Sequence, residues 1–309
     1  MSGLVSIVTP CYNGERYIAR FLDCIIMQTY RPLELIIIND GSTDRTQDII
    51  MSYQQRLQEQ DIRLIYRCQD NKGQASALNV GLELFTGEYF IWPDSDDLLY
   101  PAFISRCVCY LKENPAFGLV LTKSDKLDES DMETRLPTGI NRSNAEQLFQ
   151  NVLYRKSIFN LGFMIRTEVL LKAIPQRTIC ESRHGQNIQI LLPVSYQAKC
   201  GFIDESLCAR VVRADSHSHS YDIRDLDVLY WRTAGIMDIL IQTLRQMPFE
   251  VQPYRVYYEA QRDLYKMRMD MLKNAVDKPS AKKYLKNTGR IMGRWIIDIL
   301  KAALRLFKS

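Results

Sequence analysis

The stretch LELIIINDGSTDRTQDII, residues 33–50, indicates the fold class of this chain. Its first eight residues are mostly apolar and rich in Ile, which is typical of a strand buried on both faces of a sheet. An Asp-Gly turn follows, and a helical pattern then continues to residue 58, with Ser42 or Thr43 as the expected N-cap. A strand followed directly by a helix is the unit from which parallel sheets are built.

The same unit repeats along the first 130 residues. Further strands are predicted at 4–10, 62–68, 89–94 and 118–125, and further helices at 15–28, 73–85 and 102–114. This alternation predicts an α/β fold with a mostly parallel sheet flanked by helices. Residues 126–150 are polar and are predicted to form a linker or loop. The chain becomes mixed at 151–213 and, from about 223 onward, is predicted to be mainly helical.

The net charge of +4 over 309 residues is too small to predict a nucleic-acid partner. Its distribution is uneven, because residues 278–309 contain nine Lys or Arg and one Asp, a net charge of +8, which leaves −4 for the remainder. The basic character therefore belongs to the last part of the sequence.

The eight cysteines are scattered and form no Cys-x-x-Cys pair. This distribution predicts reduced, mostly buried thiols in a cytoplasmic protein rather than disulfides or a zinc site. The N-terminal residues show a strand pattern, and no run of 18 apolar residues is present. Neither a signal peptide nor a membrane-spanning helix is therefore expected.

Polar residues follow each of the first four predicted strands. They are Thr9, Tyr12 and Asn13, then Asn39–Ser42, then Asn71–Gly73, and finally Asp94–Asp97. An Asp-Gly-Ser-Thr run is often only a turn with a helix cap, and Asp97 is interpreted first as a helix cap and second as a ligand. The carboxyl ends of parallel strands share one edge of a sheet, where ligands bind. The four loops together therefore predict a ligand site.

Two stretches resemble a known family. SIVTPCYNGERYIARFLDCIIMQTYRPLELIIINDGSTDRTQDII and NKGQASALNVGLELFTGEYFIWPDSDDLLYP are similar to the donor-binding half of the family 2 glycosyltransferases, which have the GT-A fold. The resemblance is continuous over residues 3–125 and weaker to about residue 220. It implies a GT-A domain at 1–220, with a nucleotide-sugar half at 1–125 and an acceptor half at 126–220, followed by a helical region at 221–309.

The resemblance implies an inverting enzyme that transfers a sugar, of hexosyl or hexosaminyl type, from a nucleotide-diphosphate sugar to a saccharide hydroxyl. Asp96 resembles the ligand of a divalent cation, Mn²⁺ or Mg²⁺, and Asp94 would lie nearer the ribose or a metal-bound water. Carboxylates suit such hard cations, which neutralise the charge of a departing diphosphate. No dinucleotide-binding or P-loop motif is present.

Further residues of the same loops are implied to bind the donor. Asp40 resembles the residue that accepts a hydrogen bond from the N3–H of uracil or thymine, so a UDP-sugar is expected. Thr9 and Tyr12 resemble the wall of the base pocket. The remaining expected donor contacts are Asn13, Lys72 and Ser95, taken from the loops described above.

Inverting transfer also needs a base that takes the proton of the acceptor hydroxyl. The family usually supplies it from an acidic pair, but here CESRHGQNIQILLP, residues 180–193, has Gln186 and Asn187 at the equivalent place. Neither amide accepts a proton at neutral pH. Glu181 is the nearest acid and His184 the nearest alternative base. A structural role for Glu181 in a loop stays open.

Residues 211–222, VVRADSHSHSYD, contain two of the three histidines. The resemblance implies that His217 or His219 completes the metal or diphosphate site and that Arg213 contacts the diphosphate. Surface histidines without a function are the alternative.

The last residues, 289–309, form an amphipathic helical pattern. Its polar stripe contains Arg290, Arg294, Asp298, Lys301, Arg305 and Lys308, opposite an apolar surface with Ile291, Trp295, Ile299, Ala302 and Leu306. A basic stripe opposite Leu, Ile and Trp is typical of a helix that lies on an anionic membrane. This pattern favours a peripheral protein on the cytosolic face that acts on a lipid-linked saccharide in polysaccharide biosynthesis. Packing against the protein itself or in a homodimer is the alternative.

Two other functions compete with glycosyl transfer. A sugar nucleotidylyltransferase would need a Gly-rich, basic loop after the first strand, whereas TPCYNGERY supplies one Gly and a late Arg. A non-catalytic module that binds nucleotide or carbohydrate is favoured by the missing acidic pair.

Overall fold

The computed structural model describes residues 3–154, 162–212 and 226–274. The chain divides into two compact units, Met1–Ser216 and His217–Ser309. Each unit is described by itself.

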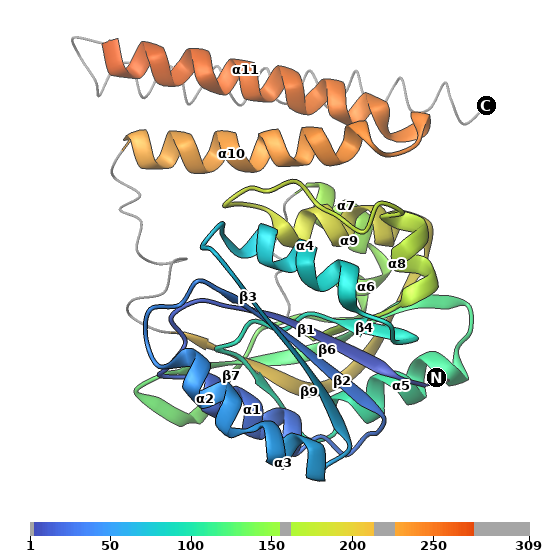
Figure 1. Cartoon of the computed structure of the whole chain (residues 1–309). Coiled ribbons are helices and arrows are strands. Elements are labelled where there is room, and N and C mark those ends of the chain that lie inside the picture. Colours follow the sequence, from blue (N-terminus) through green and yellow to red (C-terminus); the bar gives the residue numbers. More distant parts are fainter. Residues whose placement is uncertain (1–2, 155–161, 213–225, 275–309) are drawn as a thin grey trace. The chain divides into compact units, whose positions relative to one another are not determined.

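Nine strands within the described residues of the first unit form one sheet, in the order β3-β2-β1-β4-β8-β6-β9-β5, with β7 paired to β6. Their bounds are β1 Val5–Cys11, β2 Leu33–Asp40, β3 Ile62–Gln69, β4 Tyr89–Ile91, β5 Leu98–Leu99, β6 Phe117–Asp128, β7 Asp131–Pro137, β8 Phe163–Arg166 and β9 Lys199–Val212. Neighbours are parallel from β3 to β4, and β6 is parallel to β9, whereas β8 runs antiparallel to β4 and β6. The predicted α/β class with a mostly parallel sheet is confirmed (Figure 1).

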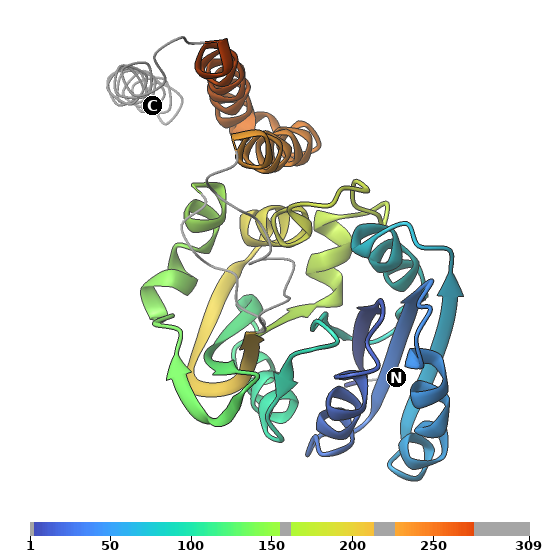
Figure 2. The ribbon, with the colours of Figure 1, turned by 90° about the vertical axis from the view of Figure 1, so that its left-hand side faces the viewer.

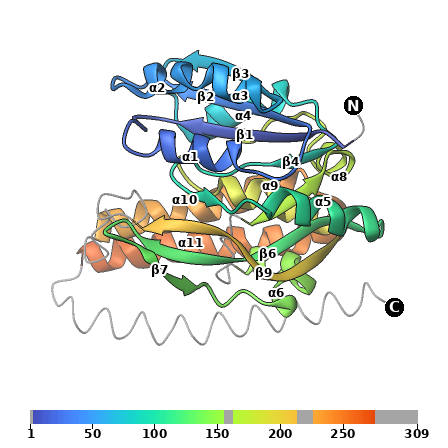
Figure 3. The ribbon, with the colours of Figure 1, turned by 90° about the horizontal axis from the view of Figure 1, so that it is seen from below.

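Helices cover both faces of this sheet. Their bounds are α1 Ile18–Ile26, α2 Thr46–Ser52, α3 Gln54–Glu59, α4 Gln74–Leu84, α5 Phe103–Glu113, α6 Arg142–Glu146, α7 Leu148–Leu153, α8 Thr167–Ala173 and α9 Gln186–Gln197. Figure 2 shows the sheet between two helical layers, with α4, α8 and α9 on one face. Figure 3 shows α1 and α5 on the other face. The strand ends between these layers position the loops of the site.

The inner strands are buried as their sequences predict. Every residue of β1 and β2 is buried, including the acidic Glu34. The Glu34 carboxylate accepts hydrogen bonds from Ser6 Oγ at 2.5 Å, from the Thr86 N–H at 2.6 Å and from Thr86 Oγ1 at 2.9 Å. These bonds stabilise a charge that would otherwise be costly inside the protein.

The helix predicted at 42–58 is wrong in two respects. It is divided at Tyr53 into α2 and α3, because the Tyr53 N–H bonds to the Ile50 carbonyl, three residues back, at 3.1 Å. Neither Ser42 nor Thr43 caps it, since Arg45 holds the N-cap position.

The linker predicted at 126–150 is also wrong. β6 continues to Asp128 and turns back into β7, and α6 and α7 follow. Along the end of β6, exposed Lys126 and Asp128 flank buried Leu127, which is the alternation of a half-buried strand. The alternation was not recognised in the sequence because most residues of the segment 126–150 are polar.

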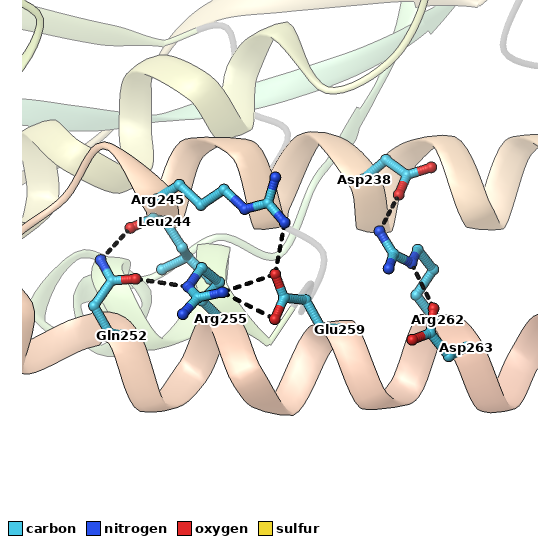
Figure 4. A network of polar contacts seen from close by, with 8 residues as sticks. All are labelled: Asp238, Leu244, Arg245, Gln252, Arg255, Glu259, Arg262 and Asp263. Atoms are coloured by element: carbon cyan, nitrogen blue, oxygen red, sulfur yellow. Dashed lines mark hydrogen bonds and ion pairs between the residues drawn. The ribbon is translucent and has the colours of Figure 1, made fainter.

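The described part of the second unit is helical, as predicted. It consists of α10 Leu226–Arg245, a 3₁₀ turn η1 Phe249–Val251 and α11 Gln252–Asn274. Figure 4 shows the ion pairs that join the two helices: Glu259 lies 2.8 Å from Arg245, and Arg262 lies 2.9 Å from Asp238. Among the described helices, none has the length and apolar character needed to cross a bilayer.

Candidate active site

The loops after β1 and β2 are joined through Asn13. Its N–H donates to Ser42 Oγ at 2.9 Å, and its Oδ1 accepts from the Thr43 N–H at 2.9 Å. Asn13 has a φ of +47°, a left-handed conformation that Asn tolerates better than most residues. The first two polar loops therefore form one surface, with the Tyr12 side chain 47% exposed beside Asn13.

Asp40 joins the loops after β2 and β3. Its side chain is buried, and Oδ1 accepts from the Lys72 N–H at 3.0 Å and from Gln69 Nε2 at 2.7 Å. Oδ2 accepts from the Gly73 N–H at 2.8 Å. A carboxylate oxygen has two lone pairs, so Oδ2 retains capacity for one more donor. The role of Asp40 toward a base ring stays a prediction.

The loop after β4 gathers three carboxylates. One oxygen from each of Asp94, Asp96 and Asp97 lies within 4.8 Å of the others. Asp97 is buried, and its burial, followed by the charges of Asp94 and Asp96, raises the pKa of its carboxyl well above the ordinary value. Such a cluster favours a proton or a cation, and its oxygen ligands fit Mg²⁺ or Mn²⁺.

The interpretation of Asp97 as a helix cap is wrong. Asp97 precedes the short strand β5, and its Oδ1 accepts from the Val211 N–H of β9 at 3.3 Å. The next helix, α5, begins at Phe103. Asp97 therefore joins the acidic loop to the sheet, which a prediction from local sequence could not include.

Contacts from two helices hold the acidic loop. Gln74, the first residue of α4, donates from Nε2 to Asp94 Oδ1 at 2.7 Å. Arg20 of α1 donates from Nη2 to the Asp96 carbonyl at 3.0 Å. The loop is thus held between the two helical layers.

Two polar side chains of β1 are buried near the carboxyl end of this strand. Cys11 is hydrogen-bonded to Ser95, and burial is the main reason why the pKa of its thiol rises to about 11. Thr9 is completely buried, and its Oγ1 has no hydrogen-bond partner in the described part of the chain. The predicted donor contacts of Thr9 and Ser95 stay predictions.

The loop before α9 contains both candidate bases. Glu181 is exposed, and His184 is half-buried, with its backbone N–H donating to Ser182 Oγ at 3.2 Å. Gln186 donates from Nε2 to the Ser182 carbonyl at 3.0 Å, so this amide closes its own loop.

The predicted metal or diphosphate contacts Arg213, His217 and His219 lie outside the described residues, as does the amphipathic segment 289–309.

Prediction from sequence missed Gln74, Asn79 and Gln189, which connect the loops. Gln189 offered a signal, because it is a polar residue within the apolar run IQILLP, and a buried amide requires partners. Asn79, in the largely apolar ASALNVGL, offered a similar one.

The mostly parallel sheet between two helical layers matches solved structures of glycosyltransferases that have the GT-A fold. The structure of Staphylococcus aureus TarS residues 1–349 in complex with UDP-GlcNAc matches with a TM-score of 0.58 at 16% identity, covering 97% of this chain and 92% of that chain. A mannosyltransferase from Pyrobaculum calidifontis in complex with GDP-Man and Mn²⁺ matches with a TM-score of 0.55 at 15% identity, covering 99% and 88%.

The chain belongs to glycosyl transferase family 2, whose model matches residues 6–170. An uncharacterized glycosyltransferase of Rickettsia typhi is 43% identical over 225 residues, which are 72% of this chain and 58% of that protein. The chain thus spans a little over half the length of this relative. The expected family and GT-A fold are confirmed.

Proposed function

We propose that this chain is an inverting, metal-dependent glycosyltransferase that moves a sugar from a nucleotide-diphosphate sugar to a hydroxyl of a saccharide. The observation that carries this proposal is the three-carboxylate cluster at the carboxyl edge of the sheet. Family membership supports the reaction class. The structural neighbours were solved with UDP-GlcNAc or with GDP-Man and Mn²⁺, which supports a nucleotide sugar and a divalent cation here.

In this mechanism, Asp94, Asp96 and Asp97 would hold the cation. When bound, the cation neutralises negative charge on the diphosphate leaving group. Asp40, with its remaining lone pair, accepts the N3–H of the base, which favours uracil, and Tyr12 stacks on the ring. Asn13, Lys72 and Ser95 contact the rest of the donor. Because Asp40 favours uracil, a UDP-sugar is the proposed donor.

Glu181 is the proposed base, with His184 as the alternative. Its carboxylate takes the proton of the acceptor hydroxyl while that oxygen forms a bond to the anomeric carbon. The bond from this carbon to the diphosphate breaks on the opposite face, which inverts the configuration. Exposure of Glu181 at the start of the α9 loop leaves it accessible to an acceptor.

The sequence of residues 289–309 supports a lipid-linked acceptor in polysaccharide biosynthesis, with the protein peripheral on the cytosolic face of a membrane. Deletion of residues 287–309 should then abolish binding to anionic vesicles without unfolding the remainder. Unchanged binding would favour packing of this segment against the protein or a dimer partner.

A thermal-shift panel tests the donor. UDP-glucose, UDP-N-acetylglucosamine, GDP-mannose and TDP-glucose are each added with Mn²⁺, because a bound donor stabilises the fold by mass action. A UDP-sugar should give the largest shift, and no shift with any of them would contradict the proposal.

Product analysis separates the alternatives. A glycosyltransferase releases nucleoside diphosphate from the sugar nucleotide that gives the largest thermal shift. Glu181→Gln should slow this release by at least about 100-fold. The exposed α4 variant Glu83→Gln serves as a control. Formation of pyrophosphate from a nucleoside triphosphate and a sugar phosphate would indicate a nucleotidylyltransferase, and binding without turnover a non-catalytic module.

A further inference from the structure

Two side-chain amides hold the backbone that leads into Glu181. Asn79 of α4 accepts the Ile179 N–H through Oδ1 at 2.7 Å and donates from Nδ2 to the Ile179 carbonyl at 2.9 Å. Gln189 of α9 accepts the Cys180 N–H through Oε1 at 2.6 Å and donates from Nε2 to the Cys180 carbonyl at 3.0 Å. Two side chains thus satisfy the N–H and C=O groups of two consecutive residues.

These hydrogen bonds are similar to those of a β-strand that is bonded to a neighbouring strand on each side. In an extended chain, successive residues direct their N–H and C=O groups to opposite sides. Here Ile179 bonds to α4 and Cys180 to α9, two helices on the same face of the sheet (Figure 1). An amide presents a donor and an acceptor side by side, as a peptide group does. A carboxylate of the same size has no donor.

Contacts on either side strengthen this anchor. Arg177 donates from Nε to the Leu82 carbonyl and from Nη2 to the Phe85 carbonyl, both at 2.6 Å, at the C-terminal end of α4. After Glu181, the Gln186 side chain closes the loop. The exposed Glu181 side chain therefore projects from a backbone that is held before and after it.

The same helix also contacts the acidic cluster. Gln74 bonds to Asp94, and Asn79 follows five residues later in α4. Five residues correspond to about 7.5 Å along a helix axis. A single helix therefore sets the spacing between a candidate metal ligand and the backbone of the candidate base.

We propose that Asn79 and Gln189 are positioning residues that hold the Ile179–Cys180 backbone and thereby place Glu181 relative to the donor. The inference rests on the proposed function, in which Glu181 is the base. Misplacement of a reacting group by about 1 Å can lower the rate about 100-fold. Loss of either amide pairing should therefore lower kcat and leave donor affinity unchanged.

The test uses the full chain with Asn79→Asp and Gln189→Glu, which keep size and acceptor but remove the donor. Each is made alone and together with Glu181→Gln. Turnover with Mn²⁺ is followed as nucleoside diphosphate release from whichever of UDP-glucose, UDP-N-acetylglucosamine and GDP-mannose the wild type hydrolyses fastest. Donor affinity and the melting temperature are measured in parallel. Asn151→Ala is the control, because this buried α7 amide bonds to the Asn144 carbonyl of α6 and not to the backbone that leads into Glu181.

With Glu181 present, we expect each variant to lower kcat at least 10-fold and to change donor affinity less than twofold. In the Glu181→Gln background, the same changes should lower kcat less than twofold, because their effect passes through Glu181. Asn151→Ala should lower kcat equally, and only slightly, in both backgrounds.

Equal losses from the amide variants in both backgrounds, or no loss in either, would overturn the positioning role while leaving Glu181 as the base. If the Glu181→Gln variant alone turns over at the wild-type rate, the base assignment is overturned, and this inference with it.

Discussion

At the scale of a residue, Asp97 shows how burial and neighbouring charges in the acidic loop affect the folded state. Within the described part of the chain, its buried carboxylate accepts a backbone hydrogen bond from the Val211 N–H and has two acidic neighbours. Burial and the charges of Asp94 and Asp96 raise the pKa of the Asp97 carboxyl, so the folded protein favours its protonated form. Without a cation, the charged form therefore opposes folding.

Asp97→Asn should stabilise the cation-free protein at neutral pH by at least about 1 kcal/mol. Asparagine retains an acceptor for the Val211 N–H and removes the charge. Because the pKa is raised in the folded state, the wild type loses stability as pH rises above the ordinary value of about 4, and the difference should vanish below it. Urea denaturation in EDTA at several pH values measures this. A less stable variant at neutral pH would contradict the account.

Individual roles were predictable only where local chemistry determines them. The motif around Asp94–Asp97 predicted an acidic cluster. The family resemblance implied that Asp40 binds the base ring, which stays a prediction, whereas the structure shows Asp40 accepting hydrogen bonds from the Lys72 and Gly73 N–H groups. The bond from Asp97 to Val211 joins residues 114 positions apart. No local pattern predicts such a contact.

Helix α4 connects most parts of the site at the scale of an element. It begins beside Asp40, contacts Asp94 through Gln74 and holds the Glu181 loop through Asn79. It also packs closely on β1, where a Cβ on Gly81 would lie 2.2 Å from Val8 Cγ1. Absence of a side chain at this position therefore sets the distance between α4 and the sheet.

Gly81→Ala should destabilise the protein by about 1–3 kcal/mol through overpacking, although alanine in a helix is otherwise favoured by about 1 kcal/mol. In a Val8→Ala background, the same change should be neutral or stabilising, because the clashing methyl group is gone. Urea denaturation of the four proteins measures this coupling. An equal cost in both backgrounds would refute the close contact.

Elements were predictable where burial is complete, and less so where it is partial. The fully buried strands β1 and β2 and the strand–helix order were predicted, because apolar runs between turns leave few alternatives. The end of β6 beyond residue 125 and the mostly exposed strand β7 were missed, because their polar residues resemble a linker. The division at Tyr53 was missed as well, since the helical pattern continues across it.

At the scale of the whole molecule, the cysteines agree with the predicted reduced state. All eight are free, five are buried, Cys180 is half-buried, and Cys68 and Cys109 are exposed. A hydrogen bond to Glu113 raises the pKa of Cys109, and burial raises that of Cys11 to about 11. In the native protein, only a few of the thiols should therefore react with a thiol reagent.

A chromogenic thiol reagent at pH 8 should react rapidly with Cys68, more slowly with Cys109, and with all eight thiols only after unfolding. Cys68→Ser should remove the fastest phase and leave the others unchanged. Fewer than eight reactive thiols in unfolded, unreduced protein would indicate disulfides and contradict the prediction.

The central claim is that the acidic loop after β4 binds a nucleoside diphosphate together with a divalent cation. Calorimetric titration of UDP with and without Mn²⁺ tests it, using the wild type, Asp96→Asn and the control Asp48→Asn on the exposed surface of α2. We expect Mn²⁺ to tighten UDP binding at least 10-fold in the wild type and in Asp48→Asn, and to have no effect in Asp96→Asn. The same gain in Asp96→Asn, or no gain in the wild type, would contradict the claim.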